Sequence, residues 1–102
     1  MLISTVVDVS GILADPLRFR IVDLLANEEL CTCHLVELTG AKQPTISHHL
    51  KVLRDAGIVS SEPVGRNTYY RLRAEALQSY ALMVSEIADR AAGATRDRLP
   101  CL

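Results

Sequence analysis

The spacing of apolar residues predicts a chain made mainly of short amphipathic helices. A first, weaker helical pattern covers roughly residues 4–14. Asp15 can then cap a second helix, whose first turn begins with Pro16 and which ends at about Ala26. The apolar residues of this second helix follow one another at helical spacing: Leu17, Ile21, Leu24 and Leu25.

Two further helices follow, with only a short turn between them. The first is predicted over residues 32–39, with Leu35 and Leu38 buried and Gly40 as the left-handed residue at its end. The second covers about residues 43–56. Its apolar row consists of Ile46, Leu50 and Leu53. Because two helices joined by a short turn containing Gly form a helix-turn-helix unit, we expect residues 43–56 to be the recognition helix.

The chain continues with a predicted β-hairpin and a last helix. Residues 58–61 and 68–72 are rich in β-formers, and residues 62–66 between them are typical of a hairpin loop, which would make this hairpin the wing. A last helix is predicted over about residues 74–92. Its apolar stripe consists of Leu77, Tyr80, Val84, Ile87 and Ala91, and a terminal helix this apolar is expected to pack against a partner.

These elements predict a mainly α fold with a small β-hairpin. The predicted architecture is a winged helix-turn-helix that forms a dimer. We expect a single domain over residues 1–102, with dimerisation elements at about 4–14 and 74–92 and a flexible tail at about 93–102. With 49% hydrophobic but only 4% aromatic residues, the composition also favours packed helices. The sequence contains neither a membrane-spanning apolar run nor the basic flank of a signal peptide, so a cytoplasmic protein is expected.

The formal net charge of −1 conceals an uneven distribution of charge. Residues 1–41 carry two basic and six acidic side chains, which gives −4, and residues 74–102 add −1. Residues 42–73 carry six basic and two acidic side chains, which gives +4. Because binding to phosphates needs a local basic surface rather than a basic total, this segment is a candidate for binding nucleic acid.

The polar face of the predicted recognition helix carries side chains suited to duplex DNA. Gln43 can pair with adenine in the major groove, Ser and Thr can contact base edges or phosphates, and Lys and Arg neutralise phosphates. Arg66, at the tip of the wing, can reach the neighbouring minor groove. A polar helix face alone is weak support, but the preceding helix, the Gly turn and the wing strengthen it. The expected DNA contacts are Lys42, Gln43, Thr45, Ser47, His48, Lys51, Arg54 and Arg66.

Asp-Pro-Leu-Arg at residues 15–18 and QPTISHHLKVLRDAGIV at residues 43–59 resemble the ArsR/SmtB family of metal-sensing repressors. The likeness spans about residues 10–90. It implies a homodimer built from the first and last helices, which binds operator DNA without ligand and releases it when an ion binds. Lys42 departs from the pattern, because many relatives have a Ser there that caps the recognition helix, and Lys cannot accept a hydrogen bond from the helix amides.

Cys31 and Cys33 are the candidate sensing residues. They fall at the start of the helix over residues 32–39, where free amides and the helix dipole favour the thiolate, which is the form that binds soft ions. Since thiols stay reduced in the cytoplasm and a disulfide between residues two apart would be strained, we expect no disulfide. The resemblance is to sensors of arsenite, antimonite, cadmium or lead, in which both thiols are ligands, and to the arsenic-responsive type in particular.

A third donor would normally complete the coordination of such an ion. The arsenite-type pattern has a third Cys where this chain has Val36, and Cys101 on an extended tail is the expected substitute. The inducer is therefore expected to be As(III) or Sb(III), with Cd(II), Pb(II) or Zn(II) as alternatives. His34 could complete a Cys2His site, but a residue one step along a helix from Cys33 points about 100° away, so a surface position is expected.

The last helix offers Glu75, Glu86 and Asp89 but no His, so we expect no second metal site there. For His48 and His49 we expect packing or phosphate contacts rather than metal binding. A thiol redox sensor of the same fold is an open alternative. A thiol enzyme is not expected, because the sequence has no Cys-x-x-Cys pair, no Gly-rich phosphate loop and no acid-base pair near the cysteines.

Overall fold

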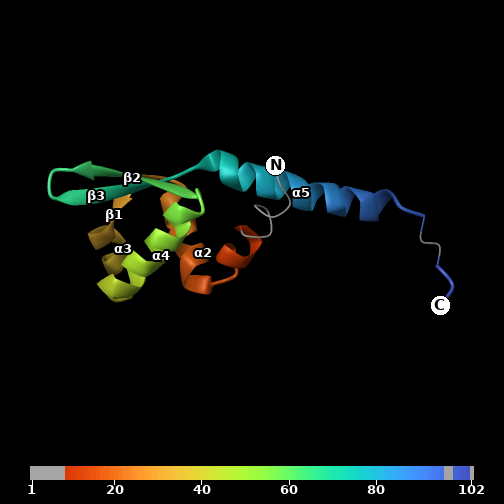
Figure 1. Ribbon diagram of the computed structural model, residues 1–102, viewed down its shortest axis with the longest axis horizontal. Helices are drawn as coiled ribbons and strands as arrows, with labels where there is room; N and C mark the ends of the chain where they lie inside the picture. The colour runs from red at the N-terminus through yellow and green to blue at the C-terminus, as the bar shows by residue number, and fades with distance from the viewer. Residues whose placement is uncertain (1–8, 96–97, 102) are drawn as a thin grey trace.

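The computed structural model describes residues 9–95 and 98–101, in which a small helical domain carries a β-hairpin at one end and a long last helix at the other (Figure 1). Residues 9–13 are helical, while residues 4–8 of the first predicted helix lie outside the described residues. The elements that follow are α2 (Pro16–Leu25), β1 (Leu30–Cys31), α3 (Thr32–Thr39), α4 (Gln43–Asp55), β2 (Val59–Val64), β3 (Asn67–Leu72) and α5 (Ala74–Gly93).

The predicted boundaries of α2, α3 and α4 are confirmed, and local residues mark the ends of these helices. The Asp15 carboxylate accepts a hydrogen bond of 3.0 Å from the Arg18 amide, and so caps α2. Gly40 ends α3 with φ 75°, and Gly57 follows α4 with φ 77°. Because this left-handed conformation costs other residues about 1–2 kcal/mol, glycine fixes the two points at which the chain changes direction around α4.

The hydrophobic core lies where α2, α3, α4 and the sheet meet. Its fully buried side chains come from each of these elements and include Ile21, Leu35, Ile46, Leu50, Leu53, Ile58 and Val59. The prediction that Leu38 is buried is wrong, because Leu38 is 47% exposed. The side of α3 that carries Leu35 and Val36 packs against the core, and Leu38 falls outside that contact. The apolar row of α4 is confirmed, and this row holds the recognition helix against α3.

The sheet has three antiparallel strands in the order β1-β3-β2, rather than the hairpin alone that the sequence predicted. Leu30 pairs with Tyr70 and Cys31 with Tyr69, so the residues just before α3 are bonded to the wing. A strand of two residues has no alternating pattern by which it could be predicted. The hairpin turn is also tighter than predicted, because β2 continues to Val64 and β3 begins at Asn67. Arg66 lies in this turn, as expected.

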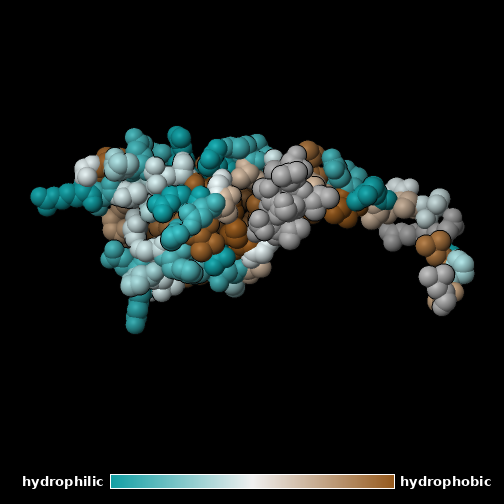
Figure 2. All heavy atoms as spheres, viewed as in Figure 1, coloured by the Kyte–Doolittle hydropathy of each residue, from teal (hydrophilic) through white to brown (hydrophobic). Residues whose placement is uncertain are grey.

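Helix α5 extends away from the rest of the domain (Figure 1). None of its residues from Ala74 to Gly93 is buried. Leu77 and Tyr80 pack partly against the core, and the Tyr80 hydroxyl lies 3.0 Å from Ser10 Oγ. Further along, Val84 is 47% and Ile87 53% exposed, and hydrophobic side chains lie along the helix in the space-filling view (Figure 2). Among the described residues, none of the helices combines the length and the hydrophobicity that a membrane span requires.

Candidate DNA-binding surface and thiol site

The structure places the predicted DNA contacts on α4, just before it, and in the turn of the wing. Lys42 is the N-cap residue of α4, and its side chain makes no capping hydrogen bond, so the departure from the family pattern leaves this helix end without a side-chain cap. Lys51 Nζ lies 2.7 Å from the Asp55 carboxylate, and both side chains are exposed. An exposed pair of this kind is worth about 0–1 kcal/mol, so the ammonium is free to exchange to a phosphate. All eight predicted residues are exposed: Lys42, Gln43, Thr45, Ser47, His48, Lys51, Arg54 and Arg66.

Unlike these exposed residues, His49 is a buried residue of α4. It is only 8% exposed, and its Nδ1 accepts a hydrogen bond of 3.1 Å from Arg18 Nε. Arg18 Nη1 also donates to the Ile12 carbonyl at 3.4 Å. The structure therefore confirms the packing role expected for His49. Through these two hydrogen bonds, Arg18 of α2 connects α4 to α2 and to the helical residues that precede α2. Because Nδ1 is an acceptor here, the neutral ring carries its proton on Nε2.

Burial of His49 lowers its pKa from the ordinary value of 6.5, and the Arg18 and His48 charges act in the same direction against the opposing effect of Asp15. A lowered pKa in the folded state means that the unfolded chain binds a proton first as the pH falls below 6.5. Folding stability should therefore fall with decreasing pH in that range, by at most about 1.4 kcal/mol per pH unit for this one group.

Substitution His49→Asn should reduce this pH dependence, because the Asn oxygen can accept from Arg18 without titrating. Urea unfolding at pH 7.5 and 5.5 should show a smaller stability difference for His49→Asn than for the unaltered protein. His48→Asn, a change at the exposed neighbour whose charge is the smallest of these contributions, is the control and should leave most of the difference in place. Equal pH dependence in the unaltered protein and in His49→Asn would contradict this role of the ring.

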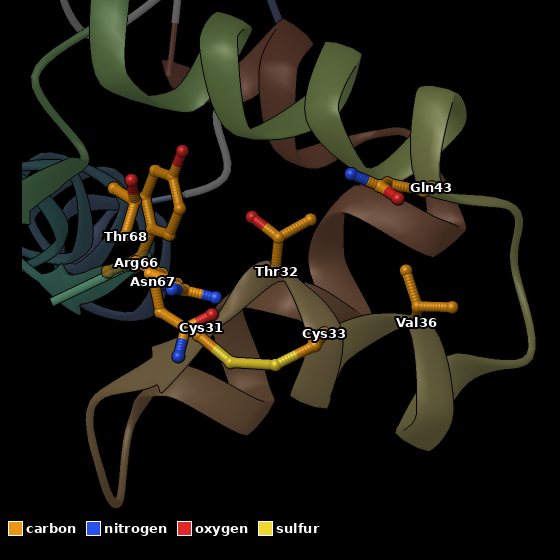
Figure 3. A pocket seen from close by; sticks show the side chains of 9 residues that line it. Cys31, Thr32, Cys33, Val36, Gln43, Arg66, Asn67 and Thr68 are labelled. Carbon is orange, nitrogen blue, oxygen red and sulfur yellow. A yellow bond between two sulfur atoms is a disulfide. The ribbon is translucent and has the colours of Figure 1, made fainter. Parts of the chain in front are cut away.

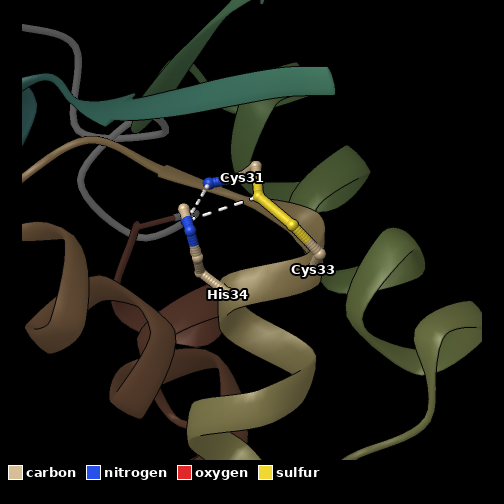
Figure 4. A group of neighbouring side chains, drawn as sticks. All are labelled: Cys31, Cys33 and His34. Atoms are coloured by element: carbon tan, nitrogen blue, oxygen red, sulfur yellow. Dashed lines mark hydrogen bonds between the residues drawn. A yellow bond between two sulfur atoms is a disulfide. The ribbon is translucent and has the colours of Figure 1, made fainter. Parts of the chain in front are cut away.

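Cys31 and Cys33 lie at the start of α3, as predicted, but they are joined in a disulfide bond (Figure 4). The expectation that no disulfide forms is therefore wrong for this structure. Cys31 is the extended N-cap residue, with φ −85° and ψ 167°, and Cys33 is already helical. This change of backbone direction brings their Cα atoms to 5.4 Å, which is within the range that disulfides span. Since a thiolate is the form that binds metals, capture of an ion requires the reduced pair.

His34 lies much closer to the thiol pair than the sequence indicated. Its Nδ1 accepts a hydrogen bond of 3.2 Å from the Cys31 amide and lies 3.3 Å from Cys31 Sγ (Figure 4). The prediction of a surface position is wrong, because the ring is half-buried and lies 6.1 Å, edge-on, from the ring of Tyr69. The relevant neighbour of His34 is Cys31 rather than Cys33. Counted from Cys31 the spacing is three residues, which puts both side chains on one face of the first turn.

The donor atoms of Cys31, Cys33 and His34 all lie within 4.8 Å of one another, which is a spacing suited to one ion. Two sulfur atoms and one imidazole nitrogen are a donor set that Zn(II) and Cd(II) accept, and the sulfur atoms suit thiophilic ions in general. Cys101 is an exposed thiol beyond α5, and the C-terminus lies at the opposite end of the molecule from α3 (Figure 1). Within one chain the structure therefore does not bring Cys101 to the pair.

The thiol pair borders a pocket of about 400 Å³ that also reaches the predicted DNA contacts Gln43 and Arg66 (Figure 3). Its walls come from the start of α3, the start of α4 and the wing strand β3. The lining residues are Cys31, Thr32, Cys33, Val36, Gln43, Arg66, Asn67, Thr68 and Tyr70. Sequence reasoning missed this meeting point because it depends on the pairing of β1 with β3. The candidate sensing residues and two predicted DNA contacts, Gln43 and Arg66, thus share one cavity.

A helix-turn-helix formed by α3 and α4, with a β2-β3 wing beside it, defines a winged helix-turn-helix protein. Residues 15–61 match the family model described as bacterial regulatory protein, arsR family. The chain belongs to this family.

Relatives and solved structures agree with this assignment. The chain is 44% identical over 66 residues to an arsenical resistance operon repressor of Staphylococcus xylosus, covering 65% of this chain and 64% of that protein. It is 43% identical over 60 residues to a transcriptional repressor SmtB homolog of Synechocystis, covering 59% of this chain and 46% of that protein. The matches thus span about half to two thirds of these relatives. Their names agree with the expectation of a regulator rather than an enzyme.

The fold is also that of a solved relative. A solution structure of the homodimeric winged helix-turn-helix DNA-binding domain Mb0332 from Mycobacterium bovis, described as a possible ArsR-family transcriptional regulator, superposes with a TM-score of 0.70. The two sequences are 29% identical, and the match covers 94% of this chain and 89% of that one. This agrees with the winged helix-turn-helix predicted from the sequence.

Proposed function

We propose that this protein is a transcriptional repressor that binds operator DNA as a homodimer and releases it when the reduced Cys31 and Cys33 thiolates bind a soft metal or metalloid ion. The observation that carries this proposal is the position of the thiol pair. Cys31 is both the last residue of β1, which pairs with the wing, and the N-cap of α3, which packs against the recognition helix. An ion at this point acts on both DNA-reading elements.

The coupling between ion and DNA follows from these connections. Drawing two thiolates and a third donor onto one ion would shift the first turn of α3, and with it α4 and the paired strands. A repressor that loses 100-fold in DNA affinity needs a coupling free energy of about 2.7 kcal/mol. A single metal-thiolate site can supply this amount. As(III) or Sb(III) is the proposed inducer, by analogy with the arsenical resistance repressor. Cd(II), Pb(II) and Zn(II) are the alternatives, and of these the His34 donor favours Cd(II) and Zn(II).

One titration tests this function directly. The reduced protein is bound to a labelled fragment of the DNA upstream of its own gene, and fluorescence anisotropy is followed as each thiophilic ion is added. Absorbance bands from thiolate coordination, recorded in the same samples, report how many thiols bind. Release of DNA in step with thiolate coordination supports the proposal, whereas coordination without release contradicts it.

We also propose that the single domain dimerises through α5 and the first helix. The exposed side chains of Val84 and Ile87 form an apolar surface on a helix with no buried residue between Ala74 and Gly93. Exposed apolar patches of this kind are typical of interfaces. The homodimeric Mycobacterium bovis domain supports a partner that is a second copy of the chain. A dimer would place two recognition helices on successive major grooves.

Substitution of the DNA-reading residues should weaken DNA binding without changing ion affinity. Gln43→Ala should raise the Kd for operator DNA by about 5- to 100-fold, because a bidentate contact to a base contributes about 1–3 kcal/mol. Arg66→Ala should weaken binding and lower its salt dependence. Anisotropy titrations at several salt concentrations measure both effects, with Arg90→Ala on α5 as the control. Unchanged DNA affinity in Gln43→Ala would exclude it from the interface.

The disulfide specifically favours a second candidate function, a repressor that senses thiol oxidation. In this case DNA release follows formation or loss of the Cys31–Cys33 bond rather than capture of an ion. Measuring DNA affinity of the oxidised and reduced protein in the presence of a chelator separates the two. A difference in affinity between these forms, with no response to arsenite, antimonite, cadmium or lead, would favour redox sensing.

A further inference from the structure

The two residues of the Cys31–Cys33 disulfide differ in their exposure to solvent. Cys31 is among the most deeply buried residues, whereas Cys33, in the first turn of α3, is exposed. Opening a disulfide by exchange requires an incoming thiolate to reach the sulfur that it attacks. This difference in burial therefore directs attack to Cys33 and makes Cys31 the leaving group.

The pocket beside the pair has the size and polarity to hold a small molecule. It measures about 400 Å³ and is walled by α3, α4 and the wing strand (Figure 3). Thr32, Gln43, Asn67 and Thr68 contribute hydroxyl and amide groups to its lining. Of the described residues that line it, Arg66 carries the charge, and its guanidinium can pair with a carboxylate. The pocket thus combines an accessible disulfide sulfur with a group that selects anions.

We propose that this pocket admits a low-molecular-weight thiol bearing a carboxylate, which opens the disulfide by attack on Cys33. The thiolate of the small molecule forms a new S–S bond with Cys33 Sγ, and the Cys31–Cys33 bond breaks. Cys31 leaves with the electron pair and takes up the proton that the incoming thiol lost. A second molecule of the thiol then attacks the sulfur of the first, which frees Cys33 and gives the reduced pair and a small-molecule disulfide.

The surroundings of Cys31 favour its departure as a thiolate. It is the N-cap of α3, where the free amides and the helix dipole stabilise negative charge. The two cysteines therefore have separate roles, with Cys33 as the sulfur that is attacked and Cys31 as the sulfur that is released. The inference concerns the oxidised protein, and it stands whether or not the reduced pair binds an ion.

The test compares an anionic and a cationic thiol on the oxidised full-length protein, without DNA and with a chelator present. Disulfide opening by 3-mercaptopropionate and by cysteamine is followed by acid quench and mass spectrometry, in the unaltered protein and in Arg66→Gln. The rate with 3-mercaptopropionate divided by the rate with cysteamine should fall by about threefold or more in Arg66→Gln, because one positive charge that attracts the carboxylate is gone. Comparing ratios cancels the different intrinsic reactivity of the two thiols.

Arg71→Gln is the matched control, because Arg71 is an exposed arginine of β3, the strand that begins just after Arg66, and it does not line this pocket. It should leave the ratio unchanged. Peptide mapping at early times should place the mixed disulfide on Cys33, with the Cys101 peptide read separately. A ratio that Arg66→Gln does not change, or a first adduct on Cys31, would overturn the proposal. Since neither DNA nor an ion is present, these results are independent of the proposed ion response.

Discussion

Replacing Cys31 or Cys33 with Ser should leave a protein that still binds operator DNA but no longer releases it when the inducing ion is added. The expected loss is the whole ion response, about 100-fold in DNA affinity, which corresponds to about 2.7 kcal/mol. A hydroxyl does not replace a thiolate as a ligand for a soft ion. The measurement is DNA anisotropy of the reduced variants, with and without the ion.

Two further variants show which third donor completes the site. His34→Ala should weaken ion affinity if the imidazole nitrogen beside Cys31 is a ligand, and Cys101→Ser should do so if the tail of either subunit supplies the donor. Both are read by the same ion titration. A Cys31→Ser protein that is still fully released by the ion would refute the assignment of the sensing site.

Introducing a charge into the apolar surface of α5 should separate the proposed dimer. In a two-fold dimer, Ile87→Glu buries two carboxylates at one interface, at a cost of several kcal/mol. Since about 1.4 kcal/mol corresponds to tenfold, the dimer dissociation constant should rise by about 100-fold or more. DNA affinity should fall with it, because a monomer contacts only one half-site.

Leu82→Glu is the matched control for this substitution. Leu82 is 61% exposed on the same helix, but at about 100° per residue it points nearly opposite to the stripe that contains Ile87. Sedimentation velocity should show a dimer for Leu82→Glu and a monomer for Ile87→Glu. If Ile87→Glu remains a dimer, the interface lies elsewhere.

The sequence alone was sufficient for the elements that depend on local signals. Asp15 with Pro16, Gly40 and Gly57 mark helix ends through backbone preferences that need no tertiary partner. The apolar row of α4 predicted both the helix and its buried face, so the exposed positions that would read DNA were also predictable. Leu38 was misjudged because helical spacing alone does not say how wide the contact with the core is.

The thiol site was only half predictable. The place of Cys31 and Cys33 at the start of α3 followed from the sequence, because the apolar spacing and Gly40 predicted a helix that begins at about residue 32. Their disulfide and the contact with His34 depend on the extended backbone at Cys31, which is set by pairing with Tyr69 in β3. A two-residue strand has no sequence pattern that predicts this pairing, because the residues with which it pairs lie almost forty positions away in the chain.

The sequence by itself determined the order of the helices, the basic segment that would face DNA and the two sulfur atoms beside it, because each rests on spacing and residue type. Only the tertiary structure decided that the start of α3 is bonded to the wing, that Arg18 holds His49 beneath the recognition helix, and that Gln43, Arg66 and Cys33 border one pocket. These contacts join residues far apart in the chain. They form only when the core brings α2, α3, α4 and the sheet together, and no local sequence pattern predicts that arrangement.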